Sequence, residues 1–410
     1  MAPTEFFVTA VRRAVLALPL LSATAALAEG NPWGIAGELD ITHDSNVLRA
    51  SAGNAVADTV YSAGIRGQLD QGIGRERLRV NALLEHNRFQ NQKALDNLSH
   101  EVTVGLSFEP GNLVFGDLGL RTARSLVNRT LGNGTVLADG NLERQTQANL
   151  RLSKGLVTTW SVVGGLDAFQ RRESLSAYRS QDLSRDSADV GVRYQSTPDL
   201  GITALLRHTQ GEYPNLGAGD DFSRNDLELR VNWAPSGASQ LELRLVRGVE
   251  SHSLTTVRDG SQWSGSVQWA WQLSGKTRLF SRLARDSDTG ARDLSTSGST
   301  DTITSYNDAL VRTTLDLGAR WQATGKIAVD LAGSRSQRSL SASLQGGTGN
   351  STGSDRTQAL QLTATYQALR NLQLSCRAAR ESRSTSGVVA GQSFPYSSTS
   401  YGCSVQAWLR

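Results

Sequence analysis

Three short stretches carry residue types that could do hydrolytic or phosphate chemistry. His100-Glu101 begins like HExxH, in which two histidines bind zinc, but Val104 stands where the second histidine belongs. Residues 349–353 read GNSTG and match G-x-S-x-G, yet they lie in a Gly-, Ser- and Thr-rich segment that we expect to be a loop, without the strand-to-helix turn that exposes a nucleophile. Residues 275–277 end like a phosphate-binding loop, but Ala270 replaces its first glycine. Because no convergent catalytic set can be named, the sequence predicts a protein that is not an enzyme and has neither a metal nor a cofactor.

Acidic residues and cysteines suggest two further kinds of site. Asp220, Asp221 and Asp226 could hold calcium, although solvated loop charge explains them as well. Cys376 and Cys403 fall on the last two alternating segments, and antiparallel pairing of these segments could place them opposite each other. In an exported chain the sequence therefore favours a structural disulfide, with a reactive thiol pair as the alternative.

The element that must position all of these residues is an alternating segment of about ten residues or slightly more. In residues 75–90, RERLRVNALLEHNRFQ, apolar residues at 78, 80, 82 and 84 alternate with polar ones, and Leu83 is the one break. A period of two predicts a β-strand, and no period of 3.6 is sustained anywhere. We predict 18 strands: 33–42, 57–71, 75–90, 97–108, 112–122, 142–153, 156–170, 185–196, 199–210, 223–234, 239–250, 261–273, 277–287, 305–322, 326–337, 356–367, 371–381 and 398–409.

The connections between these strands alternate in length. Each even-numbered strand before the last leads into a short turn, such as residues 72–74 or 109–111, and each odd-numbered strand leads into a longer polar connection. The clearest long connections are 123–141, 211–222, 288–304, 338–355 and 382–397. Short periplasmic turns and long external loops are typical of outer-membrane barrels, so the predicted fold is an all-β transmembrane antiparallel barrel.

In such a barrel the apolar row faces lipid and the polar row faces the lumen. The same alternation, carried through all strands, places one set of arginines inward: Arg66, Arg77, Arg79, Arg151, Arg193, Arg207, Arg230, Arg244, Arg278, Arg282, Arg312, Arg320 and Arg377. Inward carboxylates accompany them, so these side chains either stiffen the wall as ion pairs or line a path for a polar, anionic polymer.

Aromatic residues gather at one level of the predicted wall. We expect a periplasmic girdle near the short turns, formed by Phe108, Tyr194, Trp233, Trp271, Trp321 and Tyr366, with Trp33 and Trp160 at the same level. Trp263 is the best candidate for an outer girdle.

The N-terminus and the composition agree with export to the outer membrane. Arg12-Arg13 precede an apolar run over residues 14–21 and small residues at 26–28, which predicts a signal peptide over residues 1–28 and a barrel over residues 29–410. No later segment approaches the roughly 20 apolar residues of a membrane-spanning helix. Although the sequence pI is near 9.2, the 42 basic and 38 acidic side chains form no basic cluster, so we expect no nucleic-acid partner.

Several stretches resemble one known family. GELDITHDSNVLRA at 37–50, YSAGIRGQL at 61–69, GIGRERLRVNALLEHNRF at 72–89 and YGCSVQAWLR at 401–410 are similar to EpsL-type outer-membrane barrels, which accompany exopolysaccharide biosynthesis and exosortase systems. This resemblance implies export of an extracellular polysaccharide across the outer membrane of a Gram-negative bacterium. Its implied partners are outer-membrane lipid, the polymer, and periplasmic and inner-membrane export components. A general or sugar-specific porin and a structural or adhesive surface barrel remain as alternatives.

Overall fold

The computed structural model describes residues 32–409 except for 112–113, 128–135, 138, 156–158, 217–218, 255–258, 289–305, 309, 345–349 and 387–392. The predicted signal peptide therefore lies outside the described residues.

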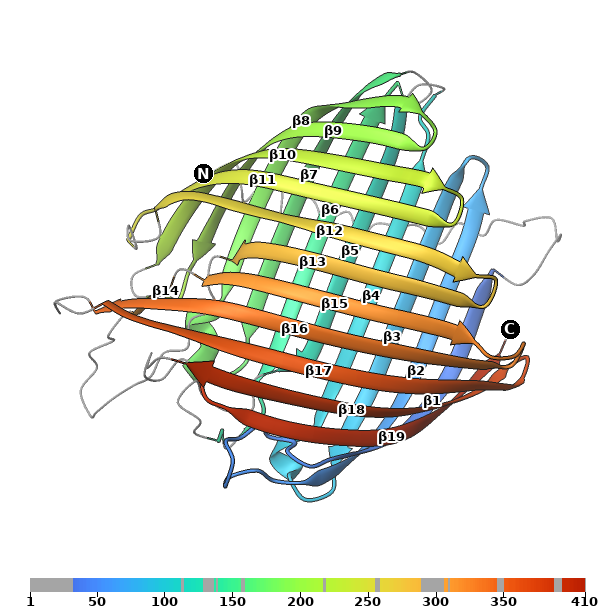
Figure 1. Ribbon diagram of the computed structural model, residues 1–410, viewed down its shortest axis with the longest axis vertical. Coiled ribbons are helices and arrows are strands. Elements are labelled where there is room, and N and C mark those ends of the chain that lie inside the picture. The colour runs from blue at the N-terminus through green and yellow to red at the C-terminus, as the bar shows by residue number, and fades with distance from the viewer. Residues whose placement is uncertain are drawn as a thin grey trace.

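The described chain forms a closed antiparallel barrel (Figure 1). Each strand pairs with its neighbours along the chain, and β1 pairs with both β2 and β19, which closes the sheet. The strands are β1 (Trp33–Asp44), β2 (Asp58–Ile73), β3 (Glu76–Phe89), β4 (Asn97–Phe108), β5 (Val114–Leu126), β6 (Leu142–Lys154), β7 (Trp160–Glu173), β8 (Leu183–Thr197), β9 (Leu200–Tyr213), β10 (Asp220–Ser236), β11 (Ser239–His252), β12 (Gly260–Ser274), β13 (Thr277–Asp288), β14 (Tyr306–Asp308), β15 (Leu310–Gln322), β16 (Ile327–Leu344), β17 (Asn350–Leu369), β18 (Leu372–Ser386) and β19 (Tyr396–Leu409).

Two of these strands, β14 and β15, together occupy one strand position in the barrel wall. β14 and β15 follow each other along the same neighbour, β16, and β15 also pairs with β13. The 19 strand segments of the described chain thus fill 18 strand positions of the barrel, which confirms the predicted architecture.

The register assigns every strand residue to one face, because cross-strand partners in an antiparallel pair point the same way. Leu39, Ile65 and Leu206, among others, lie on one face with 58 %, 61 % and 62 % of their surface exposed, and no part of the described chain covers them. Apolar side chains left open in this way predict contact with lipid, so this face is the outside of the barrel. None of the helices in the described part of the chain is long and apolar enough to cross a bilayer.

The two ends of the barrel differ, and we call them the turn end and the loop end. Gly74 and Gly111 adopt positive φ, 65° and 85°, in two connections at the turn end, where a side chain would be strained. β1 begins and β19 ends here, at the end assigned to the periplasm. The predicted aromatic girdle is confirmed here, with all its members on outward rows, and Trp160 packs against Tyr194 with ring centroids 4.7 Å apart.

At the loop end the strands are longer than the sequence predicts. Residues 338–355 were expected to form a connection, but β16 continues to Leu344 and β17 begins at Asn350, with Leu340 paired to Gly353. Both strands project beyond their neighbours (Figure 1). The prediction was wrong because a ladder of backbone hydrogen bonds can continue through Gly-, Ser- and Thr-rich sequence without an apolar row. The G-x-S-x-G match at 349–353 consequently overlaps the start of β17 and not a loop.

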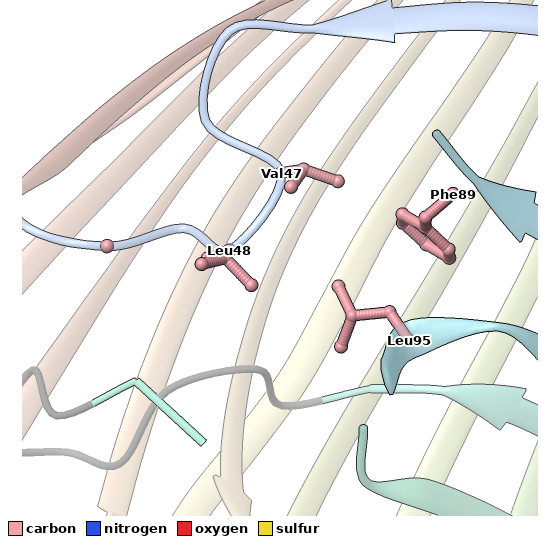
Figure 2. Close-up of a cluster of buried hydrophobic side chains, with 5 residues drawn as sticks. Val47, Leu48, Phe89 and Leu95 are labelled. Atoms are coloured by element: carbon pink, nitrogen blue, oxygen red, sulfur yellow. The ribbon is translucent and has the colours of Figure 1, made fainter. Parts of the chain in front are cut away.

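Two connections at the loop end pack on each other. Val47 and Leu48, between β1 and β2, contact Phe89 and Leu95, and all four side chains are buried (Figure 2). Leu95 ends the short helix η1 (Lys93–Leu95), and a second short helix, η2 (Ser176–Gln181), follows β7. The buried Asp58 carboxylate accepts hydrogen bonds from the backbone N–H groups of Asn91 and Gln92. This rim is therefore built by specific packing.

Candidate functional site: the charged lumen wall

The register places all thirteen sequence-predicted arginines on the inward rows. The cross-strand pairing assigns each of them to the inward face of its strand: Arg66, Arg77, Arg79, Arg151, Arg193, Arg207, Arg230, Arg244, Arg278, Arg282, Arg312, Arg320 and Arg377. The predicted orientation is confirmed. Their surroundings divide them into paired and unpaired groups.

A ladder of ion pairs on one side of the lumen links residues of five strands, β6, β8, β9, β10 and β11. Arg151 Nη1 lies 3.3 Å from Asp189 Oδ1, Arg207 Nη2 lies 3.4 Å from the same oxygen, and Arg207 Nη1 lies 3.3 Å from Glu228 Oε2. The Glu228 side chain is fully buried, and Arg244 donates to it through Nε at 2.9 Å and Nη2 at 3.0 Å. Arg230 contacts the same carboxylate. One buried glutamate thus binds three guanidinium groups, and the four arginines of the ladder outnumber its two carboxylates.

Five more of the predicted arginines form ion pairs elsewhere. Asp70 lies 2.6 Å from Arg77 and 3.8 Å from Arg79, and the other three pairs are Arg66–Glu38 at 3.4 Å, Arg377–Asp40 at 3.7 Å and Arg320–Asp330 at 3.7 Å. These residues are more exposed than Glu228, so each pair contributes less to stability.

Six inward arginines were missed by sequence reasoning: Arg121, Arg171, Arg185, Arg224, Arg338 and Arg383. Arg121 donates to Glu101 at 2.8 Å, and Arg338 pairs with the buried Asp355. The alternation of β5 would have found Arg121. Arg338 lay in an expected connection, so the extended ladder between β16 and β17 was needed to place it.

Four predicted arginines make no ion pair within the described residues. These are Arg193, Arg278, Arg282 and Arg312, on β8, β13 and β15. Arg278 stands directly opposite Arg320 across β13 and β15, and Arg282 follows on the same inward row. Two like charges face each other at the turn end, so this part of the wall has guanidinium donors available to a solute.

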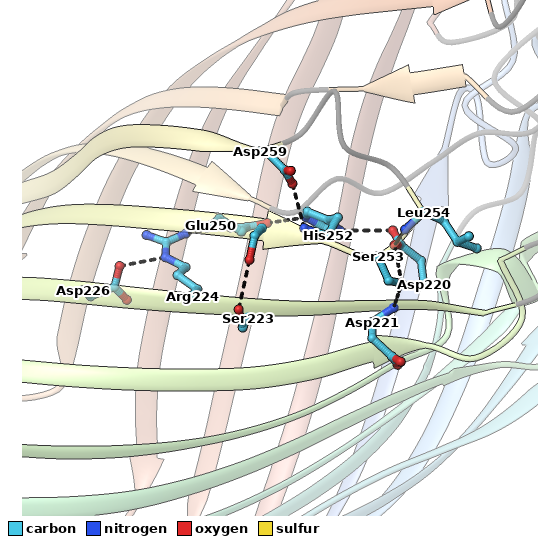
Figure 3. Close-up of polar contacts among 11 residues, drawn as sticks. Asp220, Asp221, Ser223, Arg224, Asp226, Glu250, His252, Ser253, Leu254 and Asp259 are labelled. Atoms are coloured by element: carbon cyan, nitrogen blue, oxygen red, sulfur yellow. Dashed lines mark hydrogen bonds and ion pairs between the residues drawn. The ribbon is translucent and has the colours of Figure 1, made fainter.

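A second polar cluster lies on the inward rows of β10 and β11 near the loop end (Figure 3). His252 contacts Asp220 through Nδ1 at 3.0 Å and Glu250 through Nε2 at 2.7 Å. Arg224 forms ion pairs with Glu250, at 3.4 Å, and with Asp226, at 2.7 Å. Asp220 and Asp226 therefore point into the lumen with their own partners, and Asp221 lies on the outward row. The three aspartates do not converge, so the structure does not assemble the calcium site considered from the sequence.

The two cysteines form the predicted disulfide. Cys376 on β18 is bonded to Cys403 on β19, and the two residues are direct cross-strand partners. Both lie on the outward face, in line with Leu374 and Val405. The bond ties the last hairpin of the barrel on its lipid side.

The residues of the HExxH-like stretch are separated by the wall. His100 pairs with Leu84 on the outward face, whereas Glu101 is inward and binds Arg121. Within the part of the chain that the structure describes, no three His, Cys, Asp or Glu side chains are grouped closely enough to hold a metal ion.

A closed barrel with an apolar exterior and a charged interior spans a membrane, and single-chain barrels of this size belong to the outer membrane of Gram-negative bacteria. No family model matches the sequence, and no curated protein matches it. Among solved structures, OccK1 (OpdK) of Pseudomonas aeruginosa has 13 % sequence identity and a TM-score of 0.47, over 92 % of this chain and 99 % of that chain. The siderophore receptor PirA of the same organism has 10 % identity and a TM-score of 0.43, over 94 % and 81 %. PirA of Acinetobacter baumannii has 8 % identity and a TM-score of 0.43, over 94 % and 81 %.

Proposed function

We propose that this barrel takes part in export of an extracellular polysaccharide through its lumen, and that the favoured polymers carry carboxylates. The sequence resemblance to EpsL-type barrels suggests the substrate class. The observation that carries the proposal is the pair Arg278 and Arg320, which face each other across β13 and β15. Like charges directly opposite each other in a sheet cost stability, and an anionic solute between them relieves that cost.

The position of this pair suits the entrance of a polymer. Arg278 is the second residue of β13, and Arg320 lies two residues before the end of β15, so both are at the turn end, toward the periplasm. The Arg320 side chain is 60 % exposed and its contact with Asp330 is long, at 3.7 Å. A guanidinium group can bind a sugar carboxylate through two parallel hydrogen bonds. An acidic polymer would therefore meet free donors as it enters.

The rest of the wall would let the polymer move on. Every charged side chain in the ladder from Arg151 to Arg244 has a partner of opposite charge, so the ladder attracts an anionic polymer less than unpaired arginines do. Passage through a pore requires sites that bind well enough to admit a solute and weakly enough to release it. In this proposal, periplasmic and inner-membrane components deliver the polymer and the energy.

A general or sugar-specific porin is the second candidate. Glu242, Asp286 and Asp316 lie on the inward rows of β11, β13 and β15, and β13 and β15 also carry unpaired arginines. A wall with both signs of charge also suits diffusion of small neutral sugars. The two functions predict different states of the purified barrel: a porin should be open, whereas an exporter should be closed or gated.

Two measurements test the proposal. Deletion of the gene should abolish secreted polymer and leave sugar uptake unchanged, whereas lost uptake with normal secretion would favour a porin. Unchanged secretion and uptake together with lost surface adhesion would instead support a structural or adhesive barrel. In a planar bilayer, the exporter should be closed or gated, and large steady openings would contradict it.

A further inference from the structure

Arginines also occupy the outward face, toward the loop end of several strands. Toward the loop end, the outward row of β16 reads Ile327, Val329, Leu331, Gly333, Arg335 and Gln337. The outward row of β18 begins with Leu372 and Leu374 and reaches Arg380 before Ser382 and Ser384. On both strands the row changes from apolar to polar at an arginine. Such a change marks the upper boundary of the lipid-facing band.

Outward arginines also lie toward the loop end of other strands. Arg124, Arg144 and Arg172 are successive cross-strand partners on the outward face of β5, β6 and β7. Arg247 follows Leu241, Leu243 and Leu245 on β11, and its guanidinium carbon lies 5.3 Å from the ring centroid of the outward Trp263. Outward arginines are thus a repeated feature of the loop-end half of the barrel.

Between β15 and β18 the arginines border a groove in the outer surface. The groove has a volume of about 510 Å³ and is lined by Leu315, Leu317 and Leu360 together with Arg335, Gln358 and Arg380. Arg335 is the cross-strand partner of Gln358, and Arg380 is the partner of Leu360, so the two arginines flank β17. With strands about 4.8 Å apart, their Cα atoms are roughly 11 Å apart.

The charge of this groove is not compensated by the protein. Arg335 and Arg380 are exposed, and neither forms a hydrogen bond or ion pair with a described residue. The described outward rows of β15 to β18 contain no aspartate or glutamate, because Asp316, Asp330, Asp355 and Glu381 are all inward. Two free guanidinium groups beside leucines call for a ligand that is both anionic and apolar.

We propose that this groove binds a phosphorylated glycolipid of the outer leaflet, with its phosphate on Arg335 and Arg380 and an acyl chain against the leucines. Guanidinium forks match phosphate through paired hydrogen bonds. Both arginines lie eight residues from the turn end, about 20 Å above it for strands tilted by about 40°. A long arginine side chain reaches further along the wall and places its charge at the headgroups of the outer leaflet. The proposal is independent of what passes through the lumen.

The test measures lipid retained by the purified full-length barrel. Native mass spectrometry in detergent, with diphosphorylated lipid A as the probe, should show bound lipid on the wild type. Arg335→Gln with Arg380→Gln should weaken this binding about tenfold or more. Arg335→Lys with Arg380→Lys keeps the charge without the fork and should give an intermediate loss. A control with Arg193→Gln and Arg312→Gln removes the same charge from the inward rows and should bind lipid A like the wild type.

Further lipids identify the group that is recognised. Lipid A lacking its phosphates and phosphatidylethanolamine should both bind weakly, and inorganic phosphate in millimolar excess should not displace lipid A, since it lacks the acyl chain. Gel mobility with and without heating shows that each variant is folded. Equal lipid A binding by the wild type and the glutamine variant would overturn the proposal, and so would equal binding of the phosphate-free lipid. Displacement by inorganic phosphate alone would instead show a simple anion site.

Discussion

Arg244 on β11 donates two hydrogen bonds, at 2.9 and 3.0 Å, to Glu228 on the neighbouring strand β10. Glu228 is fully buried and also contacts Arg207 and Arg230. The lumen wall is therefore tied together by one carboxylate that bridges three strands. Removing the carboxylate charge would leave Arg230 and Arg244 without their ion-pair partner in the described chain, while Arg207 would keep Asp189.

Glu228→Gln should accordingly destabilise the barrel. We expect a loss of about 1–3 kcal/mol in the free energy of unfolding, because the change removes charged hydrogen bonds but keeps the volume of the side chain. Urea unfolding in phospholipid vesicles measures the difference. Glu242→Gln is the control: Glu242 is inward on the same strand as Arg244, is exposed and has no ion-pair partner in the described chain, so its replacement should change little. Equal effects of the two variants would contradict the role given to the ladder.

Adjacent residues of a strand face opposite sides of the barrel wall, so the same substitution should change stability differently at two adjacent positions. Leu362 on β17 is 49 % exposed on the outward face, and Gln361 is its inward neighbour. Leu362→Arg puts a charge into lipid and should cost about 2–4 kcal/mol, whereas Gln361→Arg should cost under about 1 kcal/mol. Unfolding in vesicles compares the two at the same depth. A smaller cost for Leu362→Arg than for Gln361→Arg would show that the faces have been exchanged.

The Cys376–Cys403 disulfide should add stability without being required for closure. It closes a segment with a sequence separation of 27 residues, which corresponds to about 3.6 kcal/mol in the chain-entropy description. The β18–β19 ladder and the β1–β19 closure are hydrogen-bonded along their length, so a Cys376→Ala, Cys403→Ala variant should still form the barrel. Heat-dependent gel mobility measures closure and urea unfolding measures the loss. Failure of the variant to close would contradict this account.

The backbone architecture was predictable because a barrel wall has a simple period. Alternation predicted about 18 strands and the inward side of Arg66 or Arg377, and the positions of the two cysteines suggested a hairpin in which they are paired. Alternation carries no information about which charges meet. The alternation of β10 places Glu228 inward, but its three partners depend on how far side chains reach across strands. The extension of β16 and β17 at the loop end could not be predicted either, since residues 338–344 and 350–355 pair through backbone groups without an apolar pattern.

The most direct test of the proposed function is polymer secretion by cells that carry Arg278→Gln and Arg320→Gln in place of the wild-type chain. The proposal predicts that secreted polysaccharide falls severalfold while the amount of folded barrel in the outer membrane is unchanged. A control with Lys276→Gln and Arg370→Gln, in two short connections at the same end, removes two positive charges outside the pair and should secrete normally. Wild-type secretion by the Arg278 and Arg320 variant would contradict the claim that this pair receives the polymer.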